Sequence, residues 1–116
     1  MKYSRIKATG SFLPETILTN ADLEKTVETT DAWIMERTGI RSRHIARASE
    51  SSALLGEMAA KHAIESAEID KKDIDLIIVA TATPEKVFPS TACLIQKALD
   101  IPPCPWECRV FRRWLV

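Results

Sequence analysis

The chain has 116 residues, enough for one small domain or for part of a larger one. Sixteen basic residues balance sixteen acidic residues, so the overall charge provides no attraction to nucleic acid or to an anionic membrane surface. Hydrophobic residues make up 46% of the chain and charged residues 28%, which is the range of folded globular proteins. Residues 1–20 contain no signal-peptide pattern, and the longest apolar run, residues 76–80, is too short to cross a bilayer. We therefore expect a cytoplasmic protein.

The N-terminal part of the sequence predicts one strand and two helices. Residues 4–10 alternate polar and apolar side chains, which is typical of a strand with one buried face. A helix is expected from Thr19 to about Glu28, because a threonine side chain can accept a hydrogen bond from the free N–H groups of the first turn. A second, short helix is expected to begin at Thr29 and to end at Gly39, a residue suited to a left-handed cap.

The remaining sequence predicts helices around one buried strand. Residues 40–46 are expected to be extended or loop-like, and residues 51–67 form a longer helix. The β-branched run in residues 75–83 predicts a strand that is buried on both faces, as in a parallel sheet, and residues 90–99 form the next helix. This order is typical of an α/β fold. The buried strand lacks enough partners, and residues 104–116 have no clear periodicity, so we expect an incomplete domain.

Trp33 and Arg37 form the strongest candidate for a ligand site. They are four residues apart, so their side chains project from the same face of the predicted helix. An indole can stack on a flat ring and a guanidinium can pair with a phosphate, so the two together suit a nucleotide. From the spacing alone, however, an internal cation–π pair or a half-buried tryptophan that anchors the helix is favoured.

The three cysteines are expected to be reduced and to carry no chemistry. Cys93 lies in the first turn of a predicted helix, but His44 and His62 are in separate elements, so no base accompanies it. A structural cysteine in the core is favoured at this position. Cys104 and Cys108 have no second pair of ligands at zinc-site spacing, so no metal site is expected.

Several stretches of the sequence, in order and closely spaced, resemble one known family. They are Gly10-Ser11-Phe12-Leu13-Pro14, Thr19-Asn20-Ala21-Asp22-Leu23-Glu24, Trp33-Ile34-x-x-Arg37-Thr38-Gly39-Ile40-Arg41-x-Arg43, Leu76-Ile77-Ile78-Val79-Ala80-Thr81 and Phe88-Pro89-Ser90-Thr91-Ala92. The series is similar to the beginning of β-ketoacyl-acyl-carrier-protein synthase III, a family of thiolase-fold condensing enzymes. The resemblance covers residues 3–105.

The resemblance implies the N-terminal part of a thiolase-like, layered αβαβα fold that is incomplete in this chain. It also implies the acyltransferase that starts type II fatty-acid synthesis. In that reaction a short acyl group, often from acetyl-CoA, passes to an active-site cysteine and condenses with malonyl-acyl-carrier protein, with loss of carbon dioxide. Acyl-CoA is then a substrate, and no covalently bound cofactor is implied. The implied partners are acyl-carrier protein and, for full-length members, a second copy of the chain; no nucleic acid or membrane is implied.

Matching positions imply roles for five residues. Trp33 would stack on the adenine of the coenzyme, with Arg37 and Thr29 contacting the same nucleotide end. Thr38 is a weaker candidate for the same role. Phe88 matches a phenylalanine that reaches across the dimer of the family to line the acyl pocket of the partner.

The sequence departs from the family after Pro105. Residues 1–105 are expected to form a partial N-terminal thiolase-like domain, and residues 106–116 a divergent tail that arises from a lost reading frame or a truncated gene. Cys108 comes too early to be the nucleophile, and the catalytic cysteine, histidine and asparagine are absent, so the chain by itself is expected to be inactive. Two alternatives stay open: a starter condensing enzyme of polyketide or secondary metabolism, and a non-catalytic remnant that at most binds CoA.

Overall fold

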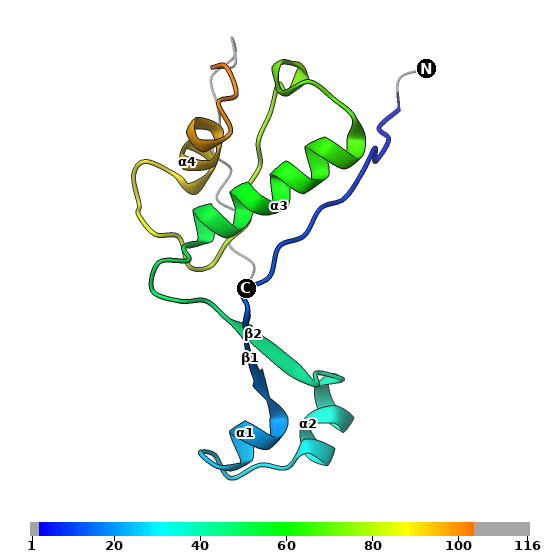
Figure 1. Ribbon diagram of the computed structural model, residues 1–116, viewed down its shortest axis with the longest axis vertical. Coiled ribbons are helices and arrows are strands. Elements are labelled where there is room, and N and C mark those ends of the chain that lie inside the picture. Colours follow the sequence, from blue (N-terminus) through cyan, green and yellow to red (C-terminus); the bar gives the residue numbers. More distant parts are fainter. Residues whose placement is uncertain (1–2, 104–116) are drawn as a thin grey trace. The chain divides into compact units, whose positions relative to one another are not determined.

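The computed structural model describes residues 3–103, and residues 1–2 and 104–116 lie outside the described part. The chain divides into two compact units. Residues 13–50 form one unit, which we call the hairpin unit. The described residues of the other, the helical unit, are 3–12 and 51–103. Each unit is described separately below, with element labels as in Figure 1.

The hairpin unit contains two strands and two short helices. Its elements are β1 (Thr16–Thr19), α1 (Asn20–Glu24), α2 (Asp31–Thr38) and β2 (Ser42–Ile45). The strands pair antiparallel, with Thr16 opposite Ile45 and Thr19 opposite Ser42. Both helices are inserted between the two strands, so the ladder brings the start of α1 and the end of α2 together (Figure 1).

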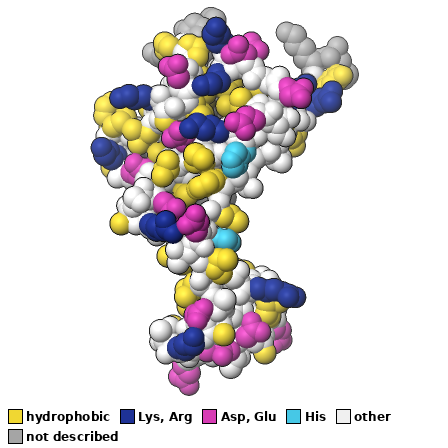
Figure 2. All heavy atoms as spheres, in the orientation of Figure 1, with side chains coloured by type: hydrophobic (Ala, Val, Ile, Leu, Met, Phe, Trp, Pro, Cys, Tyr) yellow, Lys and Arg dark blue, Asp and Glu magenta, His cyan; other side chains and the backbone are white. Residues whose placement is uncertain are grey.

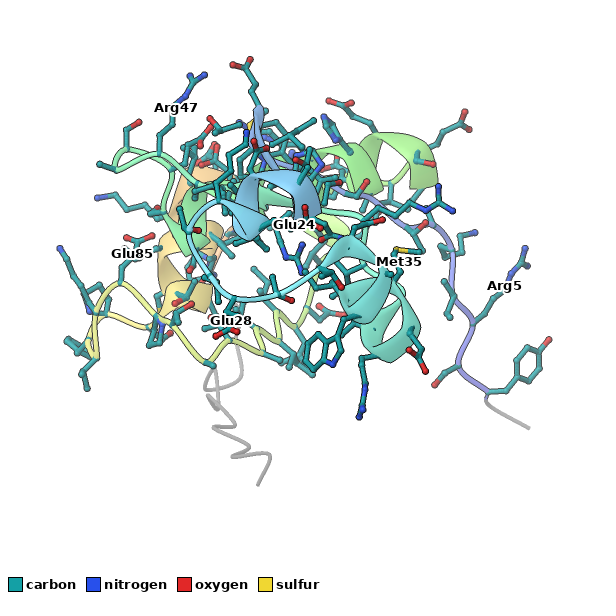
Figure 3. The ribbon with its side chains drawn as sticks, turned by 90° about the horizontal axis from the view of Figure 1, so that it is seen from below. Arg5, Glu24, Glu28, Met35, Arg47 and Glu85 are labelled. Atoms are coloured by element: carbon teal, nitrogen blue, oxygen red, sulfur yellow. The ribbon has the colours of Figure 1, made fainter. Side chains whose placement is uncertain are left out.

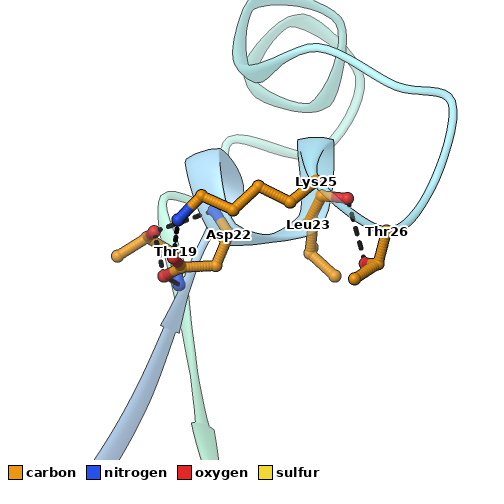
Figure 4. Close-up of polar contacts among 5 residues, drawn as sticks. All are labelled: Thr19, Asp22, Leu23, Lys25 and Thr26. Carbon is orange, nitrogen blue, oxygen red and sulfur yellow. Dashed lines mark hydrogen bonds and ion pairs between the residues drawn. The ribbon is translucent and has the colours of Figure 1, made fainter.

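A capping box starts α1, as the sequence predicts at Thr19. The Thr19 hydroxyl accepts a hydrogen bond from the Asp22 backbone N–H at 3.2 Å, and the Asp22 carboxylate accepts one from the Thr19 N–H at 3.2 Å (Figure 4). The helix ends at Glu24 rather than at Glu28. The N–H groups of Lys25 and Thr26 bond to the carbonyls three residues earlier, those of Asp22 and Leu23, so the chain tightens into a 3-10-type turn after Glu24.

The pH dependence of the hairpin unit should follow the Asp22 carboxyl group. Lys25, which donates to Asp22 at 2.9 Å, and then the Thr19 hydroxyl and N–H lower the pKa of Asp22 to about 2. Because this pKa lies below the ordinary value of 3.8, the contribution of the capping box is present above about pH 4 and is lost as the pH falls through about 2. An NMR titration of the 116-residue chain should find the Asp22 midpoint near 2, and Lys25→Met should raise it. A wild-type midpoint near 3.8 would contradict this.

The helical unit contains α3 (Ser52–Ala67), a short 3-10 helix η1 (Lys71–Asp73) and α4 (Thr91–Ala98). The Ser51 hydroxyl accepts from the Leu54 N–H at 3.2 Å and starts α3. The Ser90 hydroxyl accepts from the Cys93 N–H at 3.3 Å and starts α4. Both α3 and α4 thus begin at the serine caps that the sequence predicts.

The core of the helical unit lies between α3 and α4. Ile95, Leu99 and Ile101 are buried, and partly buried side chains of α3 and of the segment after η1 pack against them: Ala53, Ala60, Ile64, Ile74, Ile77 and Val79. A methyl group added at Gly56 of α3 would lie 2.7 Å from Cδ1 of Ile95. The absence of a side chain at Gly56 therefore lets the two helices pack closely.

The two strands predicted at residues 4–10 and 75–83 are wrong for the described structure. The one sheet in residues 3–103 is the β1–β2 pair, and neither predicted segment joins it. Ile77 and Val79 pack on the core as expected, but Leu76 and Ile78 on the alternate face are 60% and 72% exposed. A strand exists through hydrogen bonds to a neighbouring strand, so an apolar alternating pattern without such a neighbour leaves an extended segment. Figure 2 shows hydrophobic side chains at the surface of this unit.

Candidate functional site

The conformation of α2 places Trp33 at the surface of the hairpin unit. The Thr30 hydroxyl accepts from the Trp33 N–H at 3.2 Å and caps the start of the helix. Gly39 caps its end with φ of 68°, and its N–H donates to the Met35 carbonyl at 2.9 Å. Ile34 is buried, whereas Trp33 is 54% exposed. Neighbouring side chains of a helix point in different directions, so Ile34 is buried while Trp33 lies at the surface.

Arg37 lies beside the Trp33 ring, as their spacing predicts. The Arg37 guanidinium carbon is 5.6 Å from the centre of the indole, which is cation–π distance. The cation–π contact forms within the helix, and Trp33 as a whole residue is still 54% exposed. The pair presents a flat aromatic surface with a positive charge at its side.

A hollow of about 280 Å³ lies next to Trp33 and is lined by Glu28, Thr29, Thr30 and Trp33. Within residues 3–103, the Thr29 hydroxyl oxygen is the one buried side-chain nitrogen or oxygen atom that has no hydrogen-bond partner. A buried hydroxyl without a partner is unfavourable. The hollow thus lies between an aromatic residue, two threonines and Glu28.

The start of α2 is tied to α1 by side-chain hydrogen bonds. The Glu24 carboxylate accepts from the Asp31 N–H at 2.6 Å. The Asn20 amide donates to the Asp31 carboxylate at 2.6 Å and to the Ile40 carbonyl at 2.9 Å. Glu24 ends α1 and Glu28 lies on the segment that joins α1 to α2, where both are labelled in Figure 3. These bonds fix the N-terminal end of α2 next to the hollow.

The other residues named from the sequence have different surroundings. The Thr38 hydroxyl already donates to the Ile34 carbonyl at 2.8 Å and accepts from the Ile40 N–H at 3.1 Å, so its proton is engaged within the helix end. Phe88 belongs to the helical unit and is 87% exposed. Cys93 is exposed and its sulfur accepts from the Ser90 hydroxyl at 3.2 Å, so the prediction of a core cysteine is wrong. The reason is its position on α4, where Ile95 and Leu99 occupy the buried face. Cys104 and Cys108 lie outside the described residues.

Sequence reasoning missed two residues of the hollow and the bonds that support it. Thr30 was visible only as part of a helix start, and no sequence pattern marked Glu28 as a lining residue. Asn20 was part of a family motif, yet its partners Asp31, Ile40 and Arg43 are 11, 20 and 23 residues away. Contacts at such separations follow from the fold and not from local spacing.

Known proteins match both the sequence and the structure of this chain. It is 62% identical over 104 residues to the β-ketoacyl-[acyl-carrier-protein] synthase III of Thioalkalivibrio sulfidiphilus, and 54% identical over 103 residues to that of Methylococcus capsulatus. These alignments cover 90% and 89% of this chain and 32% of each relative. Over these residues the chain is similar to the β-ketoacyl-[acyl-carrier-protein] synthase III of both organisms. No protein-family model matches the chain.

Solved structures confirm the predicted fold class. The 3-oxoacyl-[acyl-carrier-protein] synthase III of Aquifex aeolicus superimposes with a TM-score of 0.80 at 48% identity, over 85% of this chain and 32% of that one. The priming β-ketosynthase of the R1128 polyketide pathway gives a TM-score of 0.78 at 34% identity, over 84% of this chain and 29% of that one. The chain therefore has the structure of part of a thiolase-like α/β enzyme and spans about a third of the length of its relatives.

No helix within residues 3–103 combines the length and the apolar character that a membrane-crossing helix needs.

Proposed function

We propose that this chain contributes the nucleotide-binding part of an acyltransferase that starts type II fatty-acid synthesis. In this reaction a short acyl-CoA, such as acetyl-CoA, condenses with malonyl-acyl-carrier protein through an acyl-cysteine intermediate. The family supports the reaction, and the observation that carries the role of this part is the exposed Trp33 ring beside the unpartnered Thr29 hydroxyl. We assign the cysteine nucleophile to no residue of this chain.

The geometry supports specific roles at the nucleotide end of CoA. Trp33 offers its indole as a stacking surface for adenine, and such stacking contributes about 1–3 kcal/mol in known complexes. The Thr29 hydroxyl has unused hydrogen-bonding capacity beside that ring. Arg37, held next to the indole, supplies a positive charge for the phosphates of the coenzyme. Thr38 is a secondary contact, because its hydroxyl proton is engaged with Ile34.

The remaining parts of the proposal concern the whole protein. Residues 1–105 form part of the N-terminal domain, and residues 106–116 are a divergent tail. Phe88, which is 87% exposed, is available to line the acyl pocket of a second subunit in the homodimer. Acyl-carrier protein is the second partner, and the protein acts in the cytoplasm. No metal or covalently bound cofactor takes part.

A starter enzyme of polyketide synthesis is the second candidate function. The structural similarity to the R1128 priming β-ketosynthase favours it, at 34% identity. The relative of Thioalkalivibrio sulfidiphilus, named for the fatty-acid enzyme, is 62% identical. The higher identity favours fatty-acid initiation.

Binding of CoA by the 116-residue chain tests the proposed role of the hairpin unit. Trp33→Ala should weaken CoA affinity by roughly 10- to 100-fold, because it removes the stacking surface. Thr29→Val should weaken CoA affinity about fivefold, yet it should leave the free energy of unfolding without ligand unchanged or raised, since the hydroxyl has no partner to lose. Isothermal titration calorimetry with CoA and with 3′,5′-ADP measures both effects.

Ile17→Ala is the matched control for these variants. Ile17 is 55% exposed, close to the 54% of Trp33, and lies on β1 of the same unit. Its replacement should leave the affinities for CoA and 3′,5′-ADP unchanged. Wild-type chain that binds neither ligand, or a Trp33→Ala variant that binds both as well as wild type does, would refute the proposed site.

A further inference from the structure

Asn20 is the most completely engaged buried polar side chain of the hairpin unit. It is only 2% exposed. Its amide nitrogen donates to the Asp31 carboxylate at 2.6 Å and to the Ile40 carbonyl at 2.9 Å, and its amide oxygen accepts from the Arg43 guanidinium. Its backbone N–H also donates to the Arg41 carbonyl at 3.4 Å. One side chain thus joins α1, both ends of α2 and β2.

We propose that Asn20 is a positioning residue that holds α2, and with it Thr29 and Trp33, in the place that coenzyme binding requires. This inference rests on the proposed function for its ligand, although the positioning itself can be measured without ligand. Asn20 contributes no surface to the hollow, which is lined by Glu28, Thr29, Thr30 and Trp33. Any effect on binding must therefore pass through the helix that it holds.

The arrangement of the bonds explains why this residue type is needed. Asp31 is the first residue of α2 and Ile40 follows its cap at Gly39, so the two N–H groups of one amide bond to the two ends of an eight-residue helix. The amide oxygen serves the Arg43 guanidinium on β2. An amide is the side-chain group that offers two donors and an acceptor together. Because the site is buried, each of these groups must be paired within the protein.

A carboxylate at position 20 separates the two functions of the amide. Asn20→Asp keeps an acceptor for Arg43 but removes both donors and places two carboxylates together at Asp31. The double variant Asn20→Asp with Asp31→Asn restores the bond to the start of α2 with donor and acceptor exchanged. If Asn20 positions α2, the single variant should lose the wild-type position of Trp33 and part of the CoA affinity. The double variant should recover most of both.

The fluorescence quenching of Trp33 is a measurement that should not change in the folded protein if Asn20 only stabilises the fold. In a Trp106→Phe, Trp114→Phe background of the 116-residue chain, Trp33 is the one remaining tryptophan. Acrylamide quenching of its fluorescence then reports the accessibility of the indole without any ligand. Circular dichroism and urea titration give the folded fraction of each variant, so that quenching and affinity are compared for the folded protein alone.

Asn20→Asp is expected to change the quenching constant of Trp33 and to weaken CoA affinity by roughly tenfold or more, because small displacements of a binding group are costly. The double variant is expected to recover most of both. Asp22→Asn is the control. Asp22 lies on α1, as Asn20 does, but it makes its polar contacts with Thr19 and Lys25, so the quenching of Trp33 should stay at the wild-type value. If Asn20→Asp does not fold, the double variant decides, with quenching and affinity expected close to those of wild type.

Two results would overturn the positioning role. One is an Asn20→Asp variant that is folded and has wild-type quenching; the other is a double variant that is folded but no closer to wild type than the single variant. The failure of the proposed function has a different signature. In that case the wild-type chain does not bind CoA, but the quenching constant of Trp33 still changes in Asn20→Asp and recovers in the double variant.

Discussion

Replacing Ile95 with alanine is expected to lower the free energy of unfolding of the helical unit by about 3 kcal/mol. Ile95 is 5% exposed and lies at the centre of the cluster with Leu99 and Ile101. The side chain contacts α3 at Gly56, so its truncation leaves a cavity between the two helices that a glycine cannot fill. The loss combines the transfer free energy of the removed methyl and methylene groups with the cost of that cavity. Urea unfolding of the 116-residue chain measures it.

Ile78→Ala provides the matched control for the core substitution. Ile78 is the same residue type in the same unit, but it is 72% exposed. Because little apolar surface is removed from water there, its replacement should change the free energy of unfolding by less than about 0.5 kcal/mol. Equal losses for Ile95→Ala and Ile78→Ala would show that the cluster around Ile95 is not the core of the unit.

Replacing Gly10 with alanine is expected to destabilise the helical unit by about 2 kcal/mol. A methyl group at Gly10 would lie 2.3 Å from the Ala59 carbonyl oxygen and 2.4 Å from the Ala63 nitrogen. Both atoms belong to the backbone of α3, so neither can rotate away. The N-terminal segment must then leave the helix, and the bond between the His62 ring and the Ser11 carbonyl at 2.8 Å is lost with it.

Gly39→Ala separates this steric cost from the general effect of replacing a glycine. At Gly39 the added methyl group meets no atom within 4 Å, and the cost arises from φ of 68° alone, about 1 kcal/mol. Hydrogen exchange should show lost protection along α3 in Gly10→Ala and an unchanged α3 in Gly39→Ala. A Gly10→Ala variant as stable as wild type would mean that the segment does not pack on α3 through this glycine.

Local signals in the sequence predicted the helices and the central pair of the site. Ser51 and Ser90 start α3 and α4, and Gly39 ends the helix that carries Trp33. Caps and left-handed glycines act within one turn, so their effect is visible in a few neighbouring residues. The spacing of Trp33 and Arg37 predicted their contact for the same reason.

Contacts between distant residues were beyond these local signals. Residues 75–83 have the pattern of a buried strand, yet the strands within residues 3–103 are β1 and β2, and β1 was not predicted. Strand pairing depends on which other segment lies beside the strand in the fold, and the alternation of side chains along the sequence does not determine that segment. The exposed position of Cys93 followed in the same way from which face of α4 meets α3.

By itself, the sequence determined the similarity to β-ketoacyl-acyl-carrier-protein synthase III, the bounds of α2, α3 and α4 to within a few residues, and the pairing of an indole with a guanidinium. The tertiary structure decided that Trp33 remains accessible, that the Thr29 hydroxyl is buried without a partner, and that Asn20 bonds to both ends of α2. The physical reason is the range of the interactions. Helix caps and one-turn pairs form between near neighbours in the chain, whereas burial and buried hydrogen bonds depend on segments that only the folded chain brings together.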